Sequence, residues 1–576
     1  MEITRRLPRA LLVAATVIGA SYQAGANAGS FSTLTYNIAG LLEPFSSSNP
    51  ATNTPIISCK IKGYTLVNVQ EDFNYHAALY DTCDDHTYRS ATSGGMGIGD
   101  GLNTLSYLPY MDWERHAWSN CNGVDCLTPK GFTHARVRLA EGTYVSLYNL
   151  HTQAQTADAD LAARQQNILQ ILAFVEAQSP SDAVIVMGDT NTRYTRVGDN
   201  IREFQKHGFT DVWINSVRGG GVPTLGGPAL TSCTDTSSAA CEVVDKVFFR
   251  TNAYVSLSAL NYLVDSVSFV DTAGNQLSDH YPVSVNWSYS TSPNFKLSDQ
   301  WGGPHGNVYN DVGQLPAKPV VSELMIRTGA RVDRVETLLS NGYIMSHGGA
   351  GGTEQRLTLG SNEYLSSLYL CAGQRSGETR VFYVRFATNT GRTLSGGRTT
   401  SSCTTYTAPS GYQITGFHGR SGDEVDKLGV VYTPRQSTAP GAATYFQIVN
   451  RNSGLCMDIN NATMGSGTNV QQWTCNGGNW QRWSYDATTG LIRSLQDPRY
   501  CLDNGGTYSD GANVQIWACT GNANQRFTLD TVSGSIRMRT YPTQVVDAFN
   551  ASATPGSNII TWTDSGGANQ RWNFVP

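Results

Sequence analysis

The sequence is poor in charge, and it has no long apolar run beyond its first twenty residues. Only 15% of its 576 residues are Asp, Glu, Lys or Arg, and the net charge is −5. This balance lacks the basic surface that tight, sequence-independent nucleic-acid binding requires. No later stretch is long and apolar enough to cross a bilayer, so no transmembrane segment is expected. No CxxC motif pairs with a second one, which argues against a structural zinc site.

The N-terminus has the pattern of an export signal. Three arginines within residues 5–9 precede an apolar run from Ala10 to Ala20, and residues 26–28 (Ala-Asn-Ala) supply a small-residue cleavage site. A membrane anchor is the weaker alternative, because the run is too short to span a bilayer. We expect residues 1–28 to be a signal peptide and the protein to be secreted and extracellular.

Twelve cysteines agree with an oxidising destination. Sequence order alone leaves their connectivity open. Paired as neighbours along the chain, they give six candidate disulfides: Cys59/Cys83, Cys121/Cys126, Cys233/Cys241, Cys371/Cys403, Cys456/Cys475 and Cys501/Cys519.

The length implies several domains, and the 58 glycines and 28 tyrosines favour many short strands and turns. A threefold repeat fills the C-terminal region. A Gln-Arg-Trp or Gln-Arg-Phe motif begins at Gln481, Gln525 and Gln570, and an Asp and a Trp recur in step with it. Because one copy cannot bury its apolar face alone, three copies imply pseudo-threefold packing around a shared core.

The repeat supports the last two cysteine pairs. Copies one and two each contain two cysteines in matching places, whereas copy three has Val545 and Asp564 there. The joint loss of both members is what a bonded pair predicts.

These phased motifs resemble the ricin-B-type β-trefoil, a carbohydrate-binding module, over residues 444–576. In that family a copy binds sugar through an Asp, a Gln, an Asn and an aromatic platform. Copy two keeps this set, which is Asp503, Gln515, Asn524 and Tyr508. Copy one has Trp480 in place of the Asn, and copy three has Ile560 in place of the Gln. We expect copy two to bind sugar and the Gln and Trp of the repeated motif to be structural.

A Pro-, Ser- and Ala-rich stretch over 435–443 is expected to be a linker. Residues 294–434 before it are rich in glycine and show alternating strand patterns, as in 380–386. The motifs WGGPHG, HGGAGG and GFHGRSGDEVDKLGVVY resemble those of jacalin-type lectins, which implies an all-β β-prism.

The same resemblance implies a sugar-binding Gly-x-x-x-Asp loop, which Gly422 and Asp426 match. Pro304 and His305 interrupt the loop that is a run of glycines in the family. A β-prism that serves only as a spacer is the alternative.

Residues 29–290 alternate strand patterns with helical ones, such as the amphipathic stretch from Leu161 to Val175. Polar residues stand at the ends of the strand patterns, where active sites of layered α/β folds gather. Each of them alone could be a turn, cap or core residue. Together they form a candidate catalytic set: Asn37, Glu71, His151, Asp189, Asn191, Asp245, Asp279 and His280.

The set suits phosphate-ester hydrolysis, which needs charge neutralisation, a base for water and leaving-group stabilisation. Glu71, Asn37 and Asp279 offer the hard oxygen ligands that Mg²⁺ prefers, with Mn²⁺ or Ca²⁺ as alternatives.

The remaining residues of the set supply the proton-transfer groups. His280, held by Asp245, is the candidate base. Asp189 and Asn191 are expected to orient the attacking water and to contact phosphate, and His151 to donate to a phosphate or leaving-group oxygen.

This ordered set resembles the endonuclease/exonuclease/phosphatase superfamily, which implies a DNase-like α/β four-layer sandwich. The family's GDFN is GDTN here, and its polar residues are kept. We therefore predict a multidomain protein in which this sandwich precedes the all-β β-prism and the all-β β-trefoil.

The segments CNGVDCLTPKGFTHARVRL and YNLHTQA resemble the secreted neutral sphingomyelinase branch. Lys130 in the first of them faces either substrate phosphate or solvent. The aromatic hairpin that carries bacterial sphingomyelinases into membranes has no Trp here, so lectin modules that hold cell-surface or cell-wall glycans are expected to help with peripheral membrane contact. The leading hypothesis is a secreted Mg²⁺-dependent phosphodiesterase acting on phospholipid. An extracellular endonuclease acting on nucleic acid, and a lectin with an inactive hydrolase domain, are the alternatives.

Overall fold

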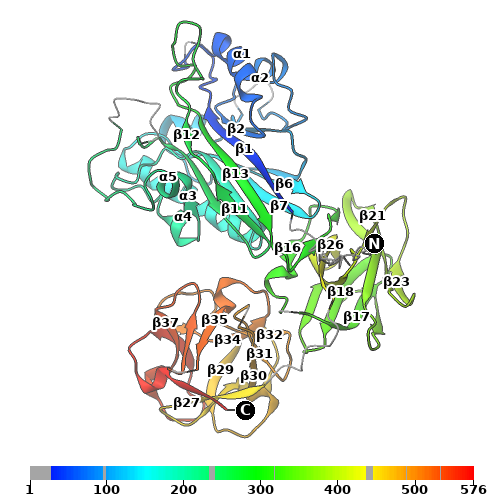
Figure 1. Cartoon of the computed structure of the whole chain (residues 1–576). Helices are drawn as coiled ribbons and strands as arrows, with labels where there is room; N and C mark the ends of the chain where they lie inside the picture. The colour runs from blue at the N-terminus through cyan, green and yellow to red at the C-terminus, as the bar shows by residue number, and fades with distance from the viewer. Residues whose placement is uncertain are drawn as a thin grey trace, which may run out of the picture.

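The computed structural model describes residues 27–43, 45–94, 99–231, 240–316, 318–435, 445–487, 489–531 and 533–575. They form three bodies in chain order (Figure 1). Most of the predicted signal peptide and of the predicted linker lies outside these residues. Within the described ranges, no helix has both the length and the apolar character to span a membrane.

The first body contains two β-sheets. One sheet has the order β11 (Val255–Ala259), β13 (Val283–Thr291), β1 (Ala28–Asn37), β2 (Leu66–Gln70), β4 (Asn103–Ser106) and β3 (Tyr88–Arg89), with β12 (Leu263–Val264) beside β13. The other has the order β5 (Tyr110–Ala117), β6 (Gly131–Ala140), β7 (Thr143–His151), β8 (Ala183–Asp189), β10 (Asp245–Arg250) and β9 (Thr210–Asp211).

Helices cover the outer faces of both sheets (Figure 1). Helices α1 (Pro50–Ile61) and α2 (His76–Asp81) share an apolar core with β1, β2 and β4. Helices α3 (Asp158–Gln178), α4 (Glu203–Lys206) and α5 (Val212–Ser216) share another with β7, β8 and β10. Aliphatic residues from the inner faces of the sheets fill the space between them. The predicted four-layer α/β sandwich is therefore confirmed.

Two parallel strand pairs bring their carboxyl ends to one rim of this sandwich. In the pair β1–β2, Asn37 lies opposite Gln70. In the pair β7–β8, His151 lies opposite Asp189. The residues that end these strands can therefore meet at one place.

The second body is a β-prism of three sheets related by an approximate threefold repeat. The sheets contain β14 (Lys296–Leu297), β15 (Trp301–Gly302), β16 (Asn307–Asn310), β25 (Tyr412–Ser421) and β26 (Val425–Pro434); β17 (Val321–Thr328), β18 (Val332–Leu339), β19 (Ile344–Gly348) and β20 (Thr353–Thr358); and β21 (Leu365–Arg375), β22 (Glu378–Thr388), β23 (Thr393–Gly397) and β24 (Ser402–Thr407). One backbone hydrogen bond recurs in all three: Gly303 N to Asp426 O, Gly349 N to Asp333 O, and Arg398 N to Phe382 O, at 2.8 to 2.9 Å.

The third body is the predicted β-trefoil. Its strands are β27 (Phe446–Asn450), β28 (Cys456–Ile459), β29 (Thr468–Trp473), β30 (Arg482–Tyr485), β31 (Ile492–Ser494), β32 (Tyr500–Asp503), β33 (Ala512–Asn513), β34 (Gln515–Ala518), β35 (Phe527–Asp530), β36 (Ser535–Met538), β37 (Gln544–Ala548), β38 (Ile559–Thr563) and β39 (Trp572–Val575). Trp483 and Trp572 are fully buried, and their indole N–H groups donate to the carbonyls of Met457 and Val546. The repeated Gln-x-Trp motif is therefore structural, as expected.

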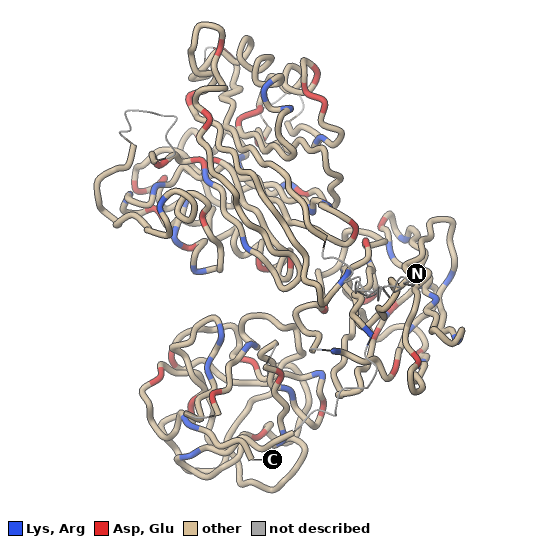
Figure 2. Tube along the Cα trace, in the orientation of Figure 1, with Lys and Arg blue, Asp and Glu red and all other residues tan. Residues whose placement is uncertain are grey.

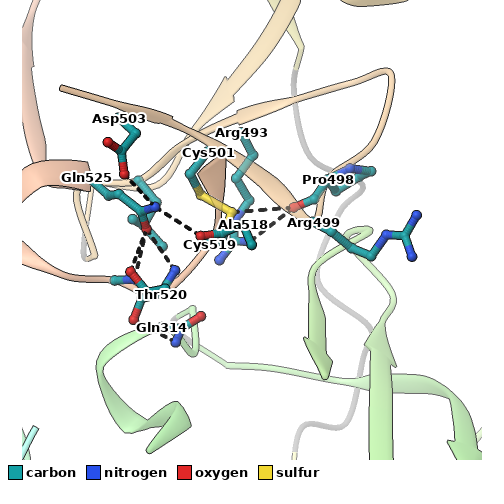
Figure 3. The surroundings of a disulfide bond; sticks show 12 residues. Gln314, Arg493, Pro498, Arg499, Cys501, Asp503, Ala518, Cys519, Thr520 and Gln525 are labelled. Carbon is teal, nitrogen blue, oxygen red and sulfur yellow. Dashed lines mark hydrogen bonds between the residues drawn. A yellow bond between two sulfur atoms is a disulfide. The ribbon is translucent and has the colours of Figure 1, made fainter. Parts of the chain in front are cut away.

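Five of the six candidate disulfides are present in full among the described residues. They are Cys59–Cys83, Cys121–Cys126, Cys371–Cys403, Cys456–Cys475 and Cys501–Cys519. Figure 3 shows the Cys501–Cys519 bond beside Gln314 of the β-prism, whose amide donates to the Thr520 carbonyl of the trefoil.

The sixth candidate disulfide, Cys233/Cys241, has a different outcome. Cys241 lies within the described residues and is disulfide-bonded rather than a free thiol. Its predicted partner, Cys233, lies outside those residues. The prediction that Cys241 is bonded is therefore confirmed, whereas its pairing with Cys233 stays a prediction.

Ion pairs and hydrogen bonds also join the sandwich to the β-prism. Arg138 pairs with Asp299 at 2.8 Å, and Arg136 donates to Gln300 at 2.7 Å. Acidic and basic residues are interspersed over all three bodies (Figure 2). This distribution agrees with the absence of a basic footprint in the sequence.

Candidate functional site

The rim where the parallel strands end gathers most of the predicted catalytic set. Asn37, the last residue of β1, is fully buried. Its side-chain amide donates to Glu71 Oε1 at 3.0 Å and to Asp189 Oδ2 at 3.2 Å. One amide therefore holds two carboxylates that are 118 residues apart in the chain, from Glu71 to Asp189.

Glu71 reaches the site because the backbone turns sharply after β2. Its φ of 57° is left-handed, which costs a non-glycine residue about 1–2 kcal/mol. The Glu71 carbonyl accepts hydrogen bonds from the amides of Gly40 and Phe73, both at 2.9 Å. A β-carbon at Gly40 would lie 2.5 Å from that carbonyl oxygen, so only glycine allows this approach.

His151 and Asn191 surround the Asp189 carboxylate. His151 Nε2 lies 3.3 Å from Asp189 Oδ2 and 3.9 Å from Glu71 Oε1. The amide of Asn191 donates to Asp189 Oδ1 at 2.9 Å, and its side chain donates to the Thr152 carbonyl. Burial by itself raises the pKa of Asp189, but His280 and His151 outweigh it and hold that pKa well below its usual range.

His280 and Asp245 form the other half of the site. His280 Nδ1 lies 2.8 Å from Asp245 Oδ2, and His280 Nε2 lies 3.7 Å from Asp189 Oδ2. Burial by itself lowers the pKa of His280, but the charges of Asp245 and Asp189 outweigh it and raise the pKa to about 11. Asp245 fixes the orientation of the imidazole. A cation bound at the neighbouring carboxylates would lower this raised pKa toward the range in which the imidazole can accept a proton.

Asp279 is placed less directly than the other residues. Its side chain is exposed, and Oδ1 accepts from the Ser278 hydroxyl at 3.3 Å. The same hydroxyl donates to the Asn37 carbonyl at 2.7 Å. Asp279 therefore lies beside Asn37 through Ser278, and no contact between Asp279 and Glu71 is found among the described residues.

The donor chemistry of the rim suits a hard divalent cation. Three carboxylates, from Glu71, Asp189 and Asp245, lie 2.8 to 3.9 Å from the ring nitrogens of His151 or His280. Ligand atoms of Asp189, Asp245 and His280 lie within 4.8 Å of one another. The Glu71 carboxylate is 23% exposed, so water can reach it together with a cation. Carboxylate oxygens with open water positions are the ligands that Mg²⁺ prefers.

Sequence reasoning missed the polar layer that supports the rim. Gln70 donates to Asn149 at 2.7 Å between the two sheets, and Asn149 donates to the Val69 carbonyl. These buried contacts fix the ends of β2 and β7 relative to each other. Asn and Gln within strands carry no distinctive sequence signal, so no pattern would have revealed them. Lys130, for which the sequence allows either substrate or solvent, pairs with Asp125 at 3.0 Å.

The predicted sugar-binding residues of trefoil copy two come together. The Asp503 carboxylate accepts from Asn524 at 2.8 Å and from Gln515 at 3.4 Å. Tyr508 stacks on Tyr541 with ring centroids 4.2 Å apart. Tyr508 and Asn524 line a cavity of about 880 Å³ that residues of the sandwich and the β-prism also border.

The β-prism residues show a different outcome. Gly422 is open, with nothing near the position of a β-carbon. The Asp426 carboxylate, however, is paired with Arg380 at 2.8 Å. Arg380 also contacts Glu378 and Glu424, so an acidic and basic cluster occupies the predicted sugar loop.

The approximate threefold repeat reveals a second loop that sequence reasoning missed. Asp333 takes the place of Asp426, and the turn Gly329-Ala-Arg-Val-Asp333 repeats the Gly-x-x-x-Asp pattern. Asp333 is 7% exposed, and no ion pair or hydrogen bond to its carboxylate is found in the described chain. β-Carbons at Gly351 and Gly352 would lie 2.6 and 2.5 Å from its oxygens. The repeated Gly-x-x-x-Asp spacing was the available signal.

Three family models match the chain in sequence order. The model described as endonuclease/exonuclease/phosphatase family 2 matches residues 53–215. The jacalin-like lectin domain matches 298–431, and the ricin-type β-trefoil lectin domain matches 444–572. The first match includes Glu71 and Asp189 but ends before His280, whose place in the site therefore rests on geometry.

Individual relatives cover separate parts of the chain. A sphingomyelinase of Mycobacterium tuberculosis is 35% identical over 270 residues, which is 45% of this chain and 53% of the relative. The chain thus spans about half the length of these curated relatives. Horcolin of Hordeum vulgare is 28% identical over 140 residues, 23% of this chain and 94% of that lectin.

Among solved structures, sphingomyelinase C of Streptomyces griseocarneus is 19% identical, with a TM-score of 0.34, covering 45% of this chain and 99% of its own. Together, the matched family models and the four-layer, β-prism and β-trefoil bodies identify the chain as a fusion of an endonuclease/exonuclease/phosphatase-family domain with a jacalin-like and a ricin-type lectin domain.

Proposed function

We propose that this protein is a secreted, divalent-metal-dependent phosphodiesterase that cleaves choline phospholipids of the sphingomyelin type. The family match supports a phosphoester hydrolase, and the sphingomyelinase relatives support this substrate class. The arginine-led apolar N-terminus and the disulfides support export.

The hydrolase proposal depends on one observation: a cluster of metal-binding side chains and a carboxylate-held histidine lie together at one rim of the sandwich. Asn37 ties Glu71 to Asp189, and Asp245 orients His280 toward the same carboxylate. A phosphodiester placed between them would contact the metal ligands on one side and the base on the other.

In the proposed reaction, the oxygen of water forms a bond to phosphorus, and the bond from phosphorus to the lipid alcohol oxygen breaks. His280 Nε2 accepts the proton of the water, and Asp245 holds the imidazole through Nδ1. Asp189 and Asn191 position the water, and His151 donates to the leaving or a non-bridging oxygen. A cation bound by Glu71, with Asn37 and Asp279 beside it, would supply the positive charge that offsets the phosphate charge. Mg²⁺ fits this donor set best, with Mn²⁺ or Ca²⁺ as alternatives.

The lectin bodies would hold the enzyme on cell-surface or cell-wall glycans. We place one sugar contact at Asp503, Gln515 and Asn524 of the trefoil. In the β-prism we place it at Asp333 rather than at Asp426, because the Asp426 carboxylate is paired with Arg380. Two linked sites raise the effective concentration of the enzyme at a glycosylated surface.

The decisive assay offers the purified protein, with Mg²⁺, three substrates: sphingomyelin liposomes, plasmid DNA and a phosphomonoester. Release of phosphocholine from sphingomyelin liposomes, without nicking of plasmid DNA, is the expected result. Strong nicking without phosphocholine release would favour the extracellular endonuclease. Glycan binding with no hydrolysis of any phosphoester would favour a lectin with an inactive hydrolase domain.

A further inference from the structure

Strongly exposed apolar side chains are concentrated on one part of the molecule. Among the described residues, eight large apolar side chains are at least half exposed: Leu42, Phe45, Val124, Leu127, Val197, Leu225, Leu260 and Val267. All eight belong to the α/β sandwich. In the described lectin bodies the most exposed large apolar side chain is Phe549, at 43%.

Most of the loops that carry these eight residues begin or end next to residues of the candidate active site. Leu42 and Phe45 follow Asn37, and Val197 and Leu225 follow Asp189. Val124 and Leu127 precede β6, whose Phe132 lies opposite Leu150 at the His151 end of β7. Leu260 and Val267 flank β12, which pairs with the first residues of β13, just after His280. Most of these exposed groups, seven aliphatic and one aromatic in all, thus lie on segments that lead to or from the active-site rim.

One of these loops is built rigidly. The Cys121–Cys126 disulfide closes it, and the Asn122 amide donates to Gln153 Oε1 at 2.8 Å. Asp125 accepts from the Ala154 amide at 2.6 Å, three residues after His151. Val124 and Leu127 nevertheless remain 73% and 75% exposed. A loop fixed this firmly to the active site, and still apolar at its tip, has little entropy to lose when it contacts a partner.

The pattern of apolar groups fits a fluid surface better than a protein. The eight side chains stand on six separate segments that connect strands and helices, so each can enter an apolar phase independently. In the described parts of these loops, Lys and Arg do not outnumber Asp and Glu, which disfavours attraction to anionic lipid. A neutral bilayer needs no basic cluster, because burial of apolar side chains provides the attraction.

We propose that this rim, with Val124 and Leu127 at its rigid point, docks on a zwitterionic phospholipid bilayer and places the active site over the lipid headgroups. This inference rests on the proposed phospholipid substrate. It gives the protein a membrane contact that needs neither a Trp-bearing hairpin nor the lectin bodies.

The test uses the full chain and glycan-free vesicles of sphingomyelin and phosphatidylcholine, so that the lectins have nothing to bind. The variant V124N/L127N changes two exposed side chains and should fold normally. We expect its vesicle binding and its kcat/KM on vesicles to fall at least tenfold. Its kcat/KM on p-nitrophenyl phosphorylcholine, a monomeric phosphodiester, should be unchanged. V575N, on an exposed residue of the trefoil, is the matched control and should match wild type on both substrates.

A second variant, F45N/V267N, tests the other loops and should weaken vesicle binding in the same way. Wild-type vesicle binding in both double variants would overturn the proposal. Stronger binding of wild type to anionic vesicles than to zwitterionic ones would also overturn it, as would binding to a protein but not to lipid. If wild type binds vesicles and the variants do not, but no phosphodiester is cleaved, then the docking surface stands and the proposed activity fails.

Discussion

His280 Nδ1 lies 2.8 Å from Asp245 Oδ2, although β10 and the turn before β13 supply the two residues from different sheets. The pair therefore bridges the two layers of the sandwich at the rim. The other ring nitrogen of His280, Nε2, lies 3.7 Å from Asp189 Oδ2. This arrangement holds an imidazole by one nitrogen and leaves the other for proton transfer.

Removing the base should abolish most of the activity without unfolding the protein. We expect His280→Ala to lower kcat on a phosphodiester by about 10²–10⁴-fold. Asp245→Asn should also lower kcat by orders of magnitude, because an amide does not hold the His280 imidazole in the required tautomer and orientation as a carboxylate does. H207A, on a half-exposed histidine of the same body, is the control. Near wild-type turnover in H280A would remove His280 as the base.

The close approach of Gly40 to Glu71 gives a second prediction. Gly40→Ala should displace the Glu71 carbonyl, because the new β-carbon would lie 2.5 Å from it. We expect kcat/KM to fall roughly 10- to 100-fold through misplacement of the Glu71 carboxylate. Gly63 has only one neighbour, 3.8 Å away, so G63A should behave like wild type. Equal activities of the two variants would show that the tight turn does not position Glu71.

The metal site can be tested by stability rather than activity. Saturating Mg²⁺ should raise the Tm of the wild-type sandwich by a few degrees, because a ligand at 100 times its Kd adds about 2.7 kcal/mol. Glu71→Gln should lose most of this increase, and chelation should remove it from wild type. Glu141→Gln, on an exposed residue, should keep it. Parallel titrations with Mn²⁺ and Ca²⁺ rank the ions. A full Mg²⁺ response in E71Q would exclude Glu71 as a ligand.

The strand-end pattern predicted which residues meet, because parallel strands bring their carboxyl ends to one rim. Asn37, Glu71 and Asp189 are examples. The four-layer fold was implied by the resemblance of that set to the endonuclease/exonuclease/phosphatase superfamily. The pattern did not predict that Asp279 is linked to Asn37 through Ser278, because the sequence does not determine whether the Asp279 side chain points into the site or toward solvent. Nor did it predict the support that Asn149 provides from inside the sandwich.

The lectin region shows what a local motif leaves open. Gly422 and Asp426 match the family pattern, but the ion pair with Arg380 comes from a strand 46 residues away in sequence. Only the assembled prism shows that the Asp426 carboxylate is paired with a basic residue, whereas no such partner of Asp333 is found among the described residues. The repeat of the Gly-x-x-x-Asp spacing at Gly329 and Asp333 was the sequence signal that could have revealed the second loop.

This contrast predicts which loop binds sugar. In a full chain carrying Asp503→Asn to silence the trefoil, Asp333→Asn should abolish the remaining glycan binding, because a carboxylate accepts sugar hydroxyls better than an amide does. Asp426→Asn should have little effect. Arg380→Ala should free Asp426 and increase the number of sugars bound per chain, measured by calorimetry on a glycan-array hit. If D426N abolishes binding and D333N does not, our assignment is wrong.

A buried histidine at the junction between the sandwich and the β-prism should make the stability of the protein depend on pH. His418 is 1% exposed and accepts a hydrogen bond from Gln300, which in turn accepts one from Arg136. Burial, together with the charge of Arg136 and against the smaller effects of Asp182 and Asp299, lowers the pKa of His418 from 6.5 to about 3. Between these two pH values the unfolded chain binds a proton that the folded chain does not.

Stability should therefore fall as the pH drops from 6.5 toward 3, by up to about 1.4 kcal/mol per pH unit from this one group. His418→Gln keeps a polar side chain but cannot titrate. The free energy of unfolding of this variant should therefore fall less steeply over this range, because unfolding takes up about one proton fewer. Calorimetric unfolding at pH 7, 6, 5 and 4 measures both slopes. His305→Gln, on a partly exposed histidine of the same body, should keep the wild-type slope. If the free energy of unfolding depends on pH with the same slope in wild type and H418Q, another group governs acid unfolding. A buried histidine that stays neutral in the folded protein must contribute to this slope, because only the unfolded chain binds its proton.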